Sequence, residues 1–269
     1  MARRSDGKAG RRPFDGPPRE GRRRPAAGGA GAPGGEWLWG RHAVEAALAN
    51  PARRVRRLLA VDAARTSDPR VDLVPAAELA RLLPAGVPHQ GLALLADPPE
   101  PTPLETMAAT AEGVLVMLDQ VTDPQNVGSI FRSAAAFGAR GLILQDRNAP
   151  PLTGSIAKAA AGALDAIPHA RVVNLARALD ELEELGWRAV GLAGGAAQTL
   201  EQVLDDRPVV LVLGSEGEGL RRLVAERCEA LARIPMPGGF ESLNVSNAAA
   251  VALYAAHRAR AAQSAGENG

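Results

Sequence analysis

From about residue 113 to residue 260, short apolar runs alternate with stretches of helical spacing, and this alternation constrains the fold more than any other feature. The runs Val114–Leu118 and Val209–Gly214 are aliphatic at nearly every position, which is typical of strands buried on both faces. Between them, Leu175–Leu185 has the spacing of a helix that Asn174 caps and Gly186 ends. The pattern predicts an α/β domain with a mainly parallel sheet, which binds ligands at the carboxyl ends of its strands. Further strands are expected at Gly141–Gln145 and Arg188–Leu192, and further helices at Val127–Phe137, Ser155–Ala163 and Ser242–Arg260.

The rest of the chain divides by composition. Residues 36–96 predict a small α/β module, with helices at Ala43–Leu48 and Pro75–Leu82 and strands at Val55–Val61 and Gly91–Ala96. Four prolines then fall within six positions, and such a run makes a stiff, extended connector. We expect a disordered basic tail over 1–35, the small module over 36–96, a linker over 97–112, the large domain over 113–262 and a C-terminal tail over 263–269.

The formal net charge of +1 conceals an asymmetry along the chain. Residues 1–35 hold nine Lys and Arg against three Asp and Glu, and the remainder holds 22 against 27. A Gly- and Pro-rich segment of this kind does not bury enough apolar surface to fold by itself. Two interpretations remain open: a solvated extension, or an arm that tethers RNA because clustered arginines neutralise phosphates.

Composition also excludes several classes of protein. Aromatic residues make up only 3% of the chain, so its core must consist of Ala, Val and Leu, which favours layered α/β packing. No window approaches the roughly eighteen uninterrupted apolar residues of a membrane span, so we expect a cytoplasmic protein. The only cysteine, Cys228, is interpreted as a small buried hydrophobe. The four histidines are His42, His89, His169 and His257. Their positions lack metal-ligand spacing, so no metal is expected.

A first polar motif, Asp119–Arg132, follows the first buried strand of the large domain. Asn126 is in position to cap the next helix, and Arg132 comes about one and two-thirds turns later, so the two side chains could frame one pocket. An arginine is costly to bury in an otherwise apolar helix. Arg132 is therefore expected either to meet an anionic ligand or to form a structural ion pair.

A second motif is the turn that follows Val209–Gly214. Its glycines have the order G-x-x-G-x-G, the reverse of the dinucleotide-binding order, and no phosphate-binding Gly-Lys-Ser/Thr follows. Glu216 and Glu218 would repel a pyrophosphate. The turn therefore favours a ligand without phosphate that approaches the backbone closely, the alternative being a purely structural turn.

A third motif runs from Ile234 to Asn247 as a strand end, a Pro/Gly turn and a polar helix start. The segment contains more polar side chains than one helix cap requires: Ser242, Asn244, Ser246 and Asn247. The surplus donors and acceptors are expected to bind the polar edge of a ligand.

In this order, the three segments resemble the three signature motifs of the SpoU/TrmH family of the SPOUT superfamily: Asn126-x-Gly128-x-x-x-Arg132, Gly214-Ser215-Glu216-Gly217-Glu218-Gly219 and Ser242-Leu243-Asn244-Val245-Ser246. The resemblance covers about residues 113 to 260. It implies a homodimeric enzyme that uses S-adenosylmethionine to methylate ribose 2′-hydroxyl groups of RNA. It also implies that the C-terminal segment of the parallel sheet domain forms a trefoil knot, a rare exception to unknotted topology.

The resemblance also assigns roles to residues. It implies catalysis by Arg132, Asn126, Glu216, Ser242 and Asn244, and cofactor binding around Gly214, Ile234 and Leu243. Because an arginine pKa stays above about 12 in proteins, we favour electrostatic activation of the 2′-hydroxyl by Arg132 over proton abstraction.

The small module resembles the RNA-substrate-binding domain of the family's ribosomal branch. The likeness lies in Gly40-Arg41-His42-Ala43-Val44 and His89-Gln90-Gly91-Leu92-Ala93, and it favours a guanosine of large-subunit ribosomal RNA as the substrate, with no DNA or membrane partner. Three alternatives stay open: a tRNA substrate, a ribosome-assembly protein without catalysis, and a dinucleotide-dependent oxidoreductase, which the reversed glycine order disfavours. The turn Gly238–Glu241 is bulkier than is usual in the family.

Overall fold

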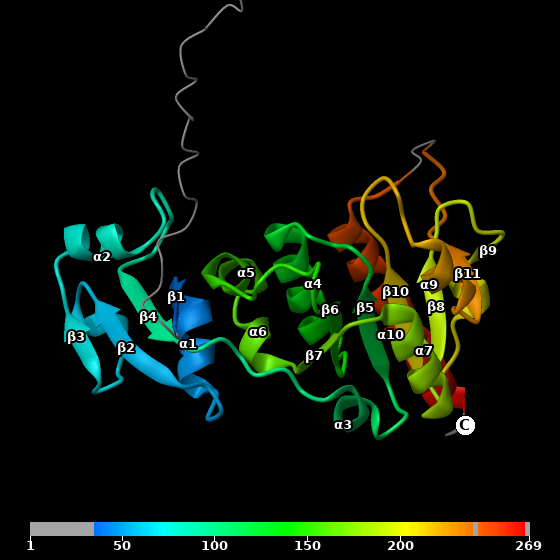
Figure 1. Cartoon of the computed structure of the whole chain (residues 1–269), viewed down its shortest axis with the longest axis horizontal. Helices are drawn as coiled ribbons and strands as arrows, with labels where there is room; N and C mark the ends of the chain where they lie inside the picture. The colour runs from blue at the N-terminus through cyan, green and yellow to red at the C-terminus, as the bar shows by residue number, and fades with distance from the viewer. Residues whose placement is uncertain (1–34, 239–241, 267–269) are drawn as a thin grey trace, which may run out of the picture.

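The computed structural model describes residues 35–238 and 242–266, which form two sheets arranged along the longest axis of the molecule (Figure 1). The larger sheet has seven strands in the order β7-β6-β5-β10-β8-β11-β9, and all neighbouring strands are parallel. The predicted parallel sheet is thus confirmed. Its strands are β5 (Val114–Leu118), β6 (Gly141–Gln145), β7 (His169–Val172), β8 (Arg188–Leu192), β9 (Gln198–Thr199), β10 (Val209–Leu213) and β11 (Ala230–Arg233).

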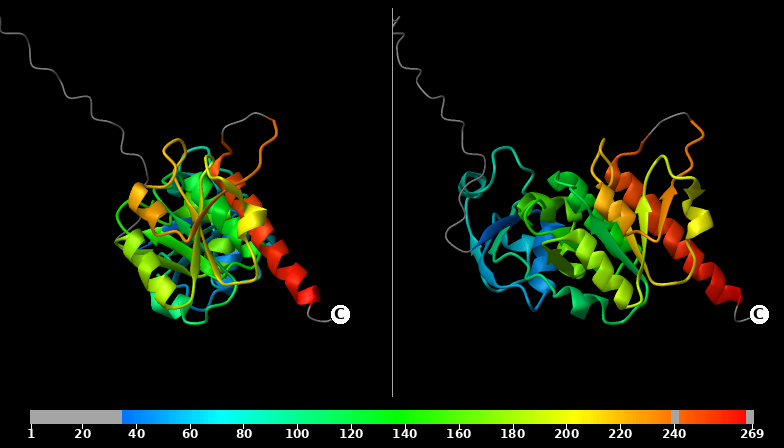
Figure 2. Two further views of the ribbon diagram at one scale, coloured as in Figure 1. Left: turned by 90° about the vertical axis from the view of Figure 1, so that its right-hand side faces the viewer. Right: turned by 45° about the vertical axis from the view of Figure 1, so that its right-hand side comes forward.

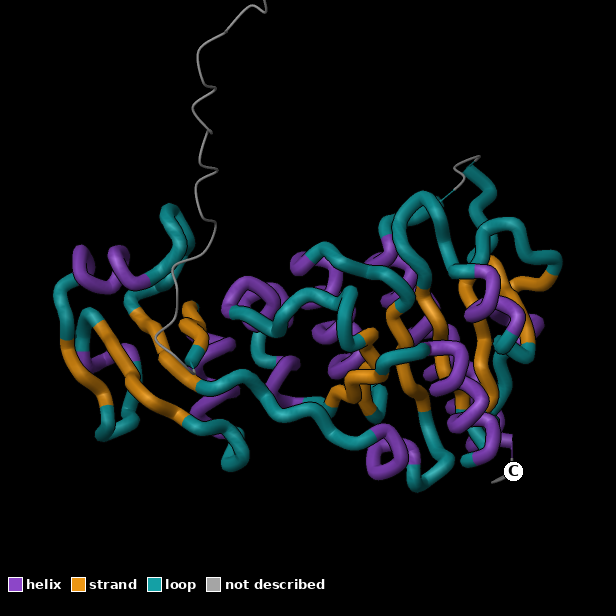
Figure 3. The backbone as a smooth tube through the Cα atoms, in the orientation of Figure 1, coloured by secondary structure: helices purple, strands orange, loops and turns teal. Residues whose placement is uncertain are grey.

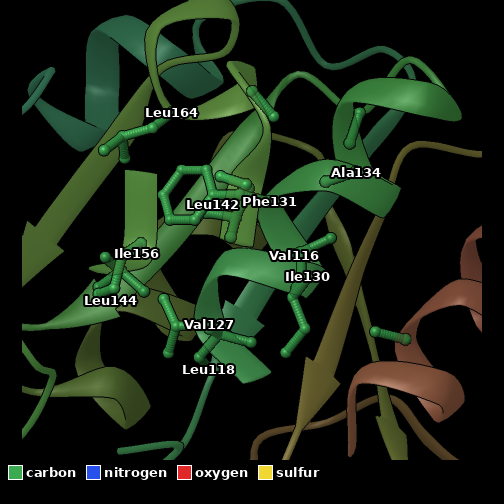
Figure 4. Packing of buried hydrophobic residues seen from close by; sticks show 14 of the residues in the cluster. Val116, Leu118, Val127, Ile130, Phe131, Ala134, Leu142, Leu144, Ile156 and Leu164 are labelled. Atoms are coloured by element: carbon green, nitrogen blue, oxygen red, sulfur yellow. The ribbon is translucent and has the colours of Figure 1, made fainter. Parts of the chain in front are cut away.

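Helices cover both faces of this sheet, and alternate residues of each strand pack against opposite layers. On β5, Val116 and Leu118 face one core, whereas Leu115 and Met117 face the other. Figure 4 shows the first core, where Phe131 and Ile130 pack beside Val116. The helices of that layer are α4 (Pro124–Ala136), α5 (Gly154–Ala160), α6 (Ala163–Ala166), α8 (Leu200–Val203) and α10 (Val245–Gly266). Those of the opposite layer are α3 (Leu104–Ala108), α7 (Leu175–Glu184) and α9 (Arg222–Glu226).

The smaller sheet is mixed and has the order β1-β4-β2-β3. β4 (Leu92–Ala96) lies between β1 (Glu36–Trp39) and β2 (Val55–Ala60) and is antiparallel to both, whereas β3 (Val71–Leu73) is parallel to β2. All five residues of β4 are buried, as expected of a central strand. The accompanying helices are α1 (Arg41–Ala49), the 3₁₀ turn η1 (Ala63–Arg65) and α2 (Ala76–Leu82).

The two sheets share one hydrophobic core. Buried residues of α1, such as Val44, belong to the same cluster as Ile156 of α5 and Leu164 of α6. Beside this core, Arg53 Nε lies 3.4 Å from Asp165 Oδ1, and both side chains are at most 2% exposed. The small module is therefore docked directly on the large one.

The proline-rich connector runs as a loop from β4 to α3 (Figure 3). The unpredicted helix α3 follows it and buries Leu104 and Met107 in the second core. The Trp187 indole Nε1 donates a hydrogen bond of 2.9 Å to the carbonyl of Ala108, the last residue of α3. The second half of the connector is thus part of the packed structure.

Several predicted boundaries were wrong. The helix expected at Ser155–Ala163 is two helices, because Ala161 and Gly162 adopt φ values of 50° and 98°. The closing helix α10 begins at Val245 instead of Ser242 and continues to Gly266, which Figure 2 shows projecting beyond the body of the molecule. The predicted tail lies outside the described residues except for Gly35, as does most of the turn Gly238–Glu241. Within the described part, no helix is long and apolar enough to span a bilayer.

Candidate functional site

A cleft of about 650 Å³ opens at the carboxyl ends of β8, β10 and β11, where a parallel sheet is expected to bind its ligand. Six of the eight predicted site residues line it: Gly214, Glu216, Ile234, Ser242, Leu243 and Asn244. Two sequence motifs about thirty residues apart therefore meet in one cleft. The other two predicted residues, Asn126 and Arg132, belong to α4 and are not among the lining residues.

Three of the predicted residues form one hydrogen-bond network. Asn244 Nδ2 donates to Glu216 Oε1 at 2.6 Å and to Asn126 Oδ1 at 3.0 Å. Asn126 Nδ2 donates to the same carboxylate oxygen at 3.2 Å, and Asn126 is 9% exposed. The Glu216 carboxylate thus joins the first motif to the third. It fixes the orientation of both side-chain amides.

The cap of α4 differs from the one predicted. Asp123, and not Asn126, caps α4: its carboxylate accepts from the backbone N–H of Gln125 at 3.1 Å, and Pro124 occupies the first helical position. Asn244 caps α10, since its Oδ1 accepts from the backbone N–H of Ser246 at 3.0 Å. Asn126 is thereby free to turn its side chain toward Glu216.

Steric limits explain why the turn that follows β10 is rich in glycine. Ser215 and Gly219 exchange backbone hydrogen bonds of 3.0 and 3.2 Å, which folds the turn back on itself. A Cβ atom on Gly214 would lie 2.1 Å from the carbonyl carbon of Gly219, so glycine is required there by the turn itself and not only by an approaching ligand. Gly217 and Gly219 have φ values of 87° and 69°, which side chains disfavour.

Arg132 stands apart from this network. It is exposed on α4 and has no hydrogen bond or ion pair to any residue that the structure describes. The structural ion pair considered from the sequence is therefore wrong for the described part of the chain. Its guanidinium remains available to an anion from outside.

Sequence reasoning missed an ion pair next to the cleft between a buried aspartate and a half-buried arginine. Asp119 follows β5 directly and is fully buried; it accepts from Arg221 Nε at 2.7 Å and from the Arg221 backbone N–H at 2.9 Å. Arg221 Nη2 reaches Gln145 Oε1, at the end of β6, at 3.4 Å. This pair ties the end of the glycine-rich turn to two neighbouring strand ends. The available signal was an aspartate placed immediately after a fully apolar strand.

Two titratable groups outside the cleft have shifted pKa values. Burial, assisted by the nearby charge of Asp119, raises the pKa of the Cys228 thiol to about 12, so the thiol is protonated at neutral pH and is a poor nucleophile. Burial, with smaller contributions from Arg171 and Arg53, lowers the pKa of His169 to about 4. Among the described residues, no three His, Cys, Asp or Glu side chains are grouped as metal ligands.

Comparison with known proteins places these features in context. The sequence matches the SpoU rRNA Methylase family over residues 113–254 and the family described as RNA 2'-O ribose methyltransferase substrate binding over residues 37–102. It is 38% identical over 242 residues to the 23S rRNA (guanosine-2'-O-)-methyltransferase RlmB of Pseudomonas aeruginosa. The aligned region covers 84% of this chain and 97% of that protein.

Two solved structures extend the likeness to three dimensions. The SpoU methyltransferase AviRb from Streptomyces viridochromogenes, in complex with AdoMet, has a TM-score of 0.74 at 25% identity and covers 85% of this chain and 91% of its own. The AdoMet-bound rRNA methyltransferase from Sinorhizobium meliloti has a TM-score of 0.70 at 27% identity, with coverages of 83% and 87%. Both comparisons include the small sheet as well as the large one, since each spans more than four-fifths of the chain.

Proposed function

Because this chain belongs to the SpoU rRNA methylase family, we propose that it transfers a methyl group from S-adenosylmethionine to the ribose 2′-hydroxyl of a guanosine in 23S ribosomal RNA. The observation that carries the proposal is the match to RlmB over 97% of that protein's length, which includes the part that binds RNA. Ribosomal RNA is thus favoured over tRNA. The substrate in turn implies a cytoplasmic enzyme.

The cleft suits this cofactor in the chemistry of its lining. Among the described lining residues, it combines small and aliphatic groups with one carboxylate, Glu216, and one cation, Arg233, without a lysine or a phosphate-binding loop. We assign the backbone around Gly214, Ile234 and Leu243 to holding the cofactor, which supplies the methyl group when bound. A ligand with a sulfonium and no phosphate matches a cleft that carries a carboxylate and lacks a phosphate cradle.

The proposed catalytic roles follow from the contacts. Arg132, exposed and unpaired among described residues, would contact the ribose 2′-oxygen and its phosphate and stabilise the developing alkoxide. Glu216 holds the amides of Asn126 and Asn244, which would orient the nucleotide. Ser242, on the rim of the cleft, adds a hydroxyl donor. Positioning of this kind supplies much of the rate in a displacement that needs an aligned nucleophile.

Assembly and domain roles are part of the proposal. We assign RNA binding to residues 36–96, connection to 97–112 and methyl transfer to 113–262, with a trefoil knot in the C-terminal part. A homodimer formed through this domain is supported by α10, which exposes the large apolar side chains of Val251 and Tyr254 at 40% and 51%. Light scattering at micromolar concentration would test the dimer.

The proposed reaction is tested with tritiated S-adenosylmethionine and three substrates: a 23S rRNA transcript, the same RNA carrying a 2′-O-methyl group at the mapped guanosine, and a tRNA pool. Tritium should enter the first substrate alone, and nuclease digestion with mass spectrometry should identify the labelled product as 2′-O-methylguanosine. Label in the tRNA pool would redirect the assignment. Absence of both turnover and cofactor binding by titration calorimetry would favour an assembly protein without catalysis.

A further inference from the structure

Lysine is almost absent from this chain. Of its 31 lysines and arginines, only Lys8 and Lys158 are lysines, so Lys158 is the single lysine in the part that the structure describes. Arginine occupies every other described basic position, on the surface and in buried pairs alike. Because a compact ammonium and a planar guanidinium fit different sites, the surroundings of Lys158 are informative.

Lys158 lies on α5, where the large module meets the small one (Figure 1). Its Nζ donates to Gln90 Oε1 at 3.3 Å. A Cβ atom built on Gly40 would come within 2.3 Å of this nitrogen, so the ammonium lies directly against the Gly40 backbone. Among the described residues, no carboxylate pairs with Lys158. Lys158 is only partly exposed, and its ammonium has no countercharge among the residues that the structure describes.

Gln90, the partner of Lys158, has an unusual backbone conformation. Its φ of 55° is one that non-glycine residues rarely adopt, and such conformations persist where the surroundings enforce them. Its Oε1 accepts both the Arg41 backbone N–H, at 3.1 Å, and the Lys158 ammonium. Gln90 thus places the charge of Lys158 at a defined point on the seam between the two modules.

The seam itself has little freedom to open. The buried Arg53–Asp165 pair crosses it, and a Cβ atom on Gly162 would lie 2.9 Å from the Ala46 Cβ. Asn50 Nδ2 of the small module donates a further hydrogen bond to Asp165 Oδ1 at 3.2 Å. The position of Lys158 is therefore fixed relative to both modules.

We infer that Lys158 binds a backbone phosphate of the RNA where the strand crosses from the small module toward the cleft, and that Gln90 is the positioning residue for this contact. The inference rests on the proposed function, which places RNA on both modules. An ammonium has three N–H donors, of which Gln90 takes one, leaving two for phosphate oxygens. A phosphate contact of this kind sets the register of the RNA without reading its sequence.

The first test measures RNA binding against salt for the full chain, using the 23S rRNA transcript. Lys158→Gln should weaken binding about tenfold and reduce the slope of log K against log salt by about 0.7 to 0.9. Lys158→Arg keeps the positive charge and should restore most of the salt slope. Gln90→Gly, which removes the side chain and relieves the backbone, should weaken binding less than Lys158→Gln. The matched control is Arg177→Gln, on α7 of the opposite layer, which should leave both quantities unchanged.

The kinetic signature separates positioning from chemistry and from folding. In Lys158→Gln, KM for RNA should rise, whereas kcat should stay within about twofold of the parent value, because Lys158 is outside the cleft lining. A Lys158→Gln protein with the parent salt slope would overturn the inference, even if its melting temperature fell, since that outcome describes a purely structural contact. Turnover by the parent protein tests the proposed function separately, because binding and salt slope are measured without cofactor.

The scarcity of lysine allows a second, variant-free test. An amine-acylating reagent has only Lys8, Lys158 and the terminal amine to modify. Saturating RNA should slow acylation of Lys158 several-fold in the mass-spectrometric peptide map, whereas polyglutamate at equal charge should not. Equal acylation of Lys158 with and without RNA would contradict the proposed contact.

Discussion

The two modules of this protein differ in how deeply they bury several of their charged and polar groups. In the large module, polar groups at strand ends are buried and partnered, as with Asp119, which is 0% exposed, and Asn126, which is 9% exposed. In the small module, Arg57 of β2 lies at the surface in a solvated ion pair: the Arg57 and Asp72 side chains are 49% and 63% exposed. The seam between the modules adds a third case, the fully buried pair of Arg53 and Asp165.

The comparison teaches where charge contributes to the fold and where it is available to a ligand. A buried polar group must find partners when the chain folds, because leaving it unpaired costs more than a hydrogen bond returns. Its geometry is then set by the fold. A solvated arginine contributes little to stability and can exchange its partner for a phosphate.

The largest expected effect is on activity, at an exposed residue. Arg132→Ala should lower kcat about 10²- to 10³-fold, because a donor to the developing alkoxide is lost, while cofactor affinity stays within a few-fold. Since Arg132 has no partner among described residues, the free energy of unfolding should change by less than about 0.5 kcal/mol. Turnover with tritiated cofactor and urea unfolding measure the two quantities. Arg132→Lys should also be poor, because it lacks the planar fork, and normal turnover by Arg132→Ala would refute the assigned role.

The next effect is on stability, at the seam. Burial raises the pKa of Asp165 and lowers that of Arg53, so desolvation outweighs the attraction within this pair. Asp165→Ala should cost about 3–5 kcal/mol in the free energy of unfolding, because it leaves a buried guanidinium without a countercharge.

The control for this prediction removes both charges. Arg53→Met combined with Asp165→Leu should restore stability to near the parent value, because two apolar side chains replace two desolvated ions. A double variant as unstable as Asp165→Ala would mean that the pair itself holds the seam, and that the shared hydrophobic core is secondary.

A smaller effect depends on pH. The His169 pKa of about 4 in the folded protein lies below its unfolded value near 6.5, so the unfolded state takes up a proton first as the pH falls. Stability should therefore decrease as the pH falls from about 6.5 toward 4, with about 2 kcal/mol lost by pH 5. Urea titrations at pH 7 and pH 5 measure this loss, and His169→Gln should abolish it. An equal loss in parent and variant would place the acid sensitivity elsewhere.

The smallest effect is expected at the surface of the small module. Arg57→Ala removes an ion pair of 3.7 Å between two solvated side chains and should change the free energy of unfolding by less than about 0.5 kcal/mol. Thermal unfolding at low and high salt measures it. A decrease in the free energy of unfolding above about 1.5 kcal/mol would contradict the view that the solvated Arg57–Asp72 pair contributes little to stability.

Much of the architecture was predictable because its signals are local. The strands Val114–Leu118, Gly141–Gln145 and Arg188–Leu192 have the predicted bounds, since an aliphatic run between turn residues has few alternatives. Asn174 caps α7 as predicted, its Oδ1 accepting from the Arg177 backbone N–H at 3.3 Å. The unpredicted strands β1, β3, β7 and β9 are two to four residues long, and their apolar pattern is too short to detect.

By itself, then, the sequence determined the alternation of strands and helices, the parallel sheet and, through three motifs in order, the family of this protein. Tertiary structure alone decided that Glu216 bonds to Asn126 and Asn244, which are 90 and 28 positions away. It also decided that a module set off by prolines shares its core with the large one. The physical reason is that periodicity acts over one helical turn or one pleat, whereas a buried polar atom takes its partner from whichever distant segment the packed fold brings within hydrogen-bonding distance.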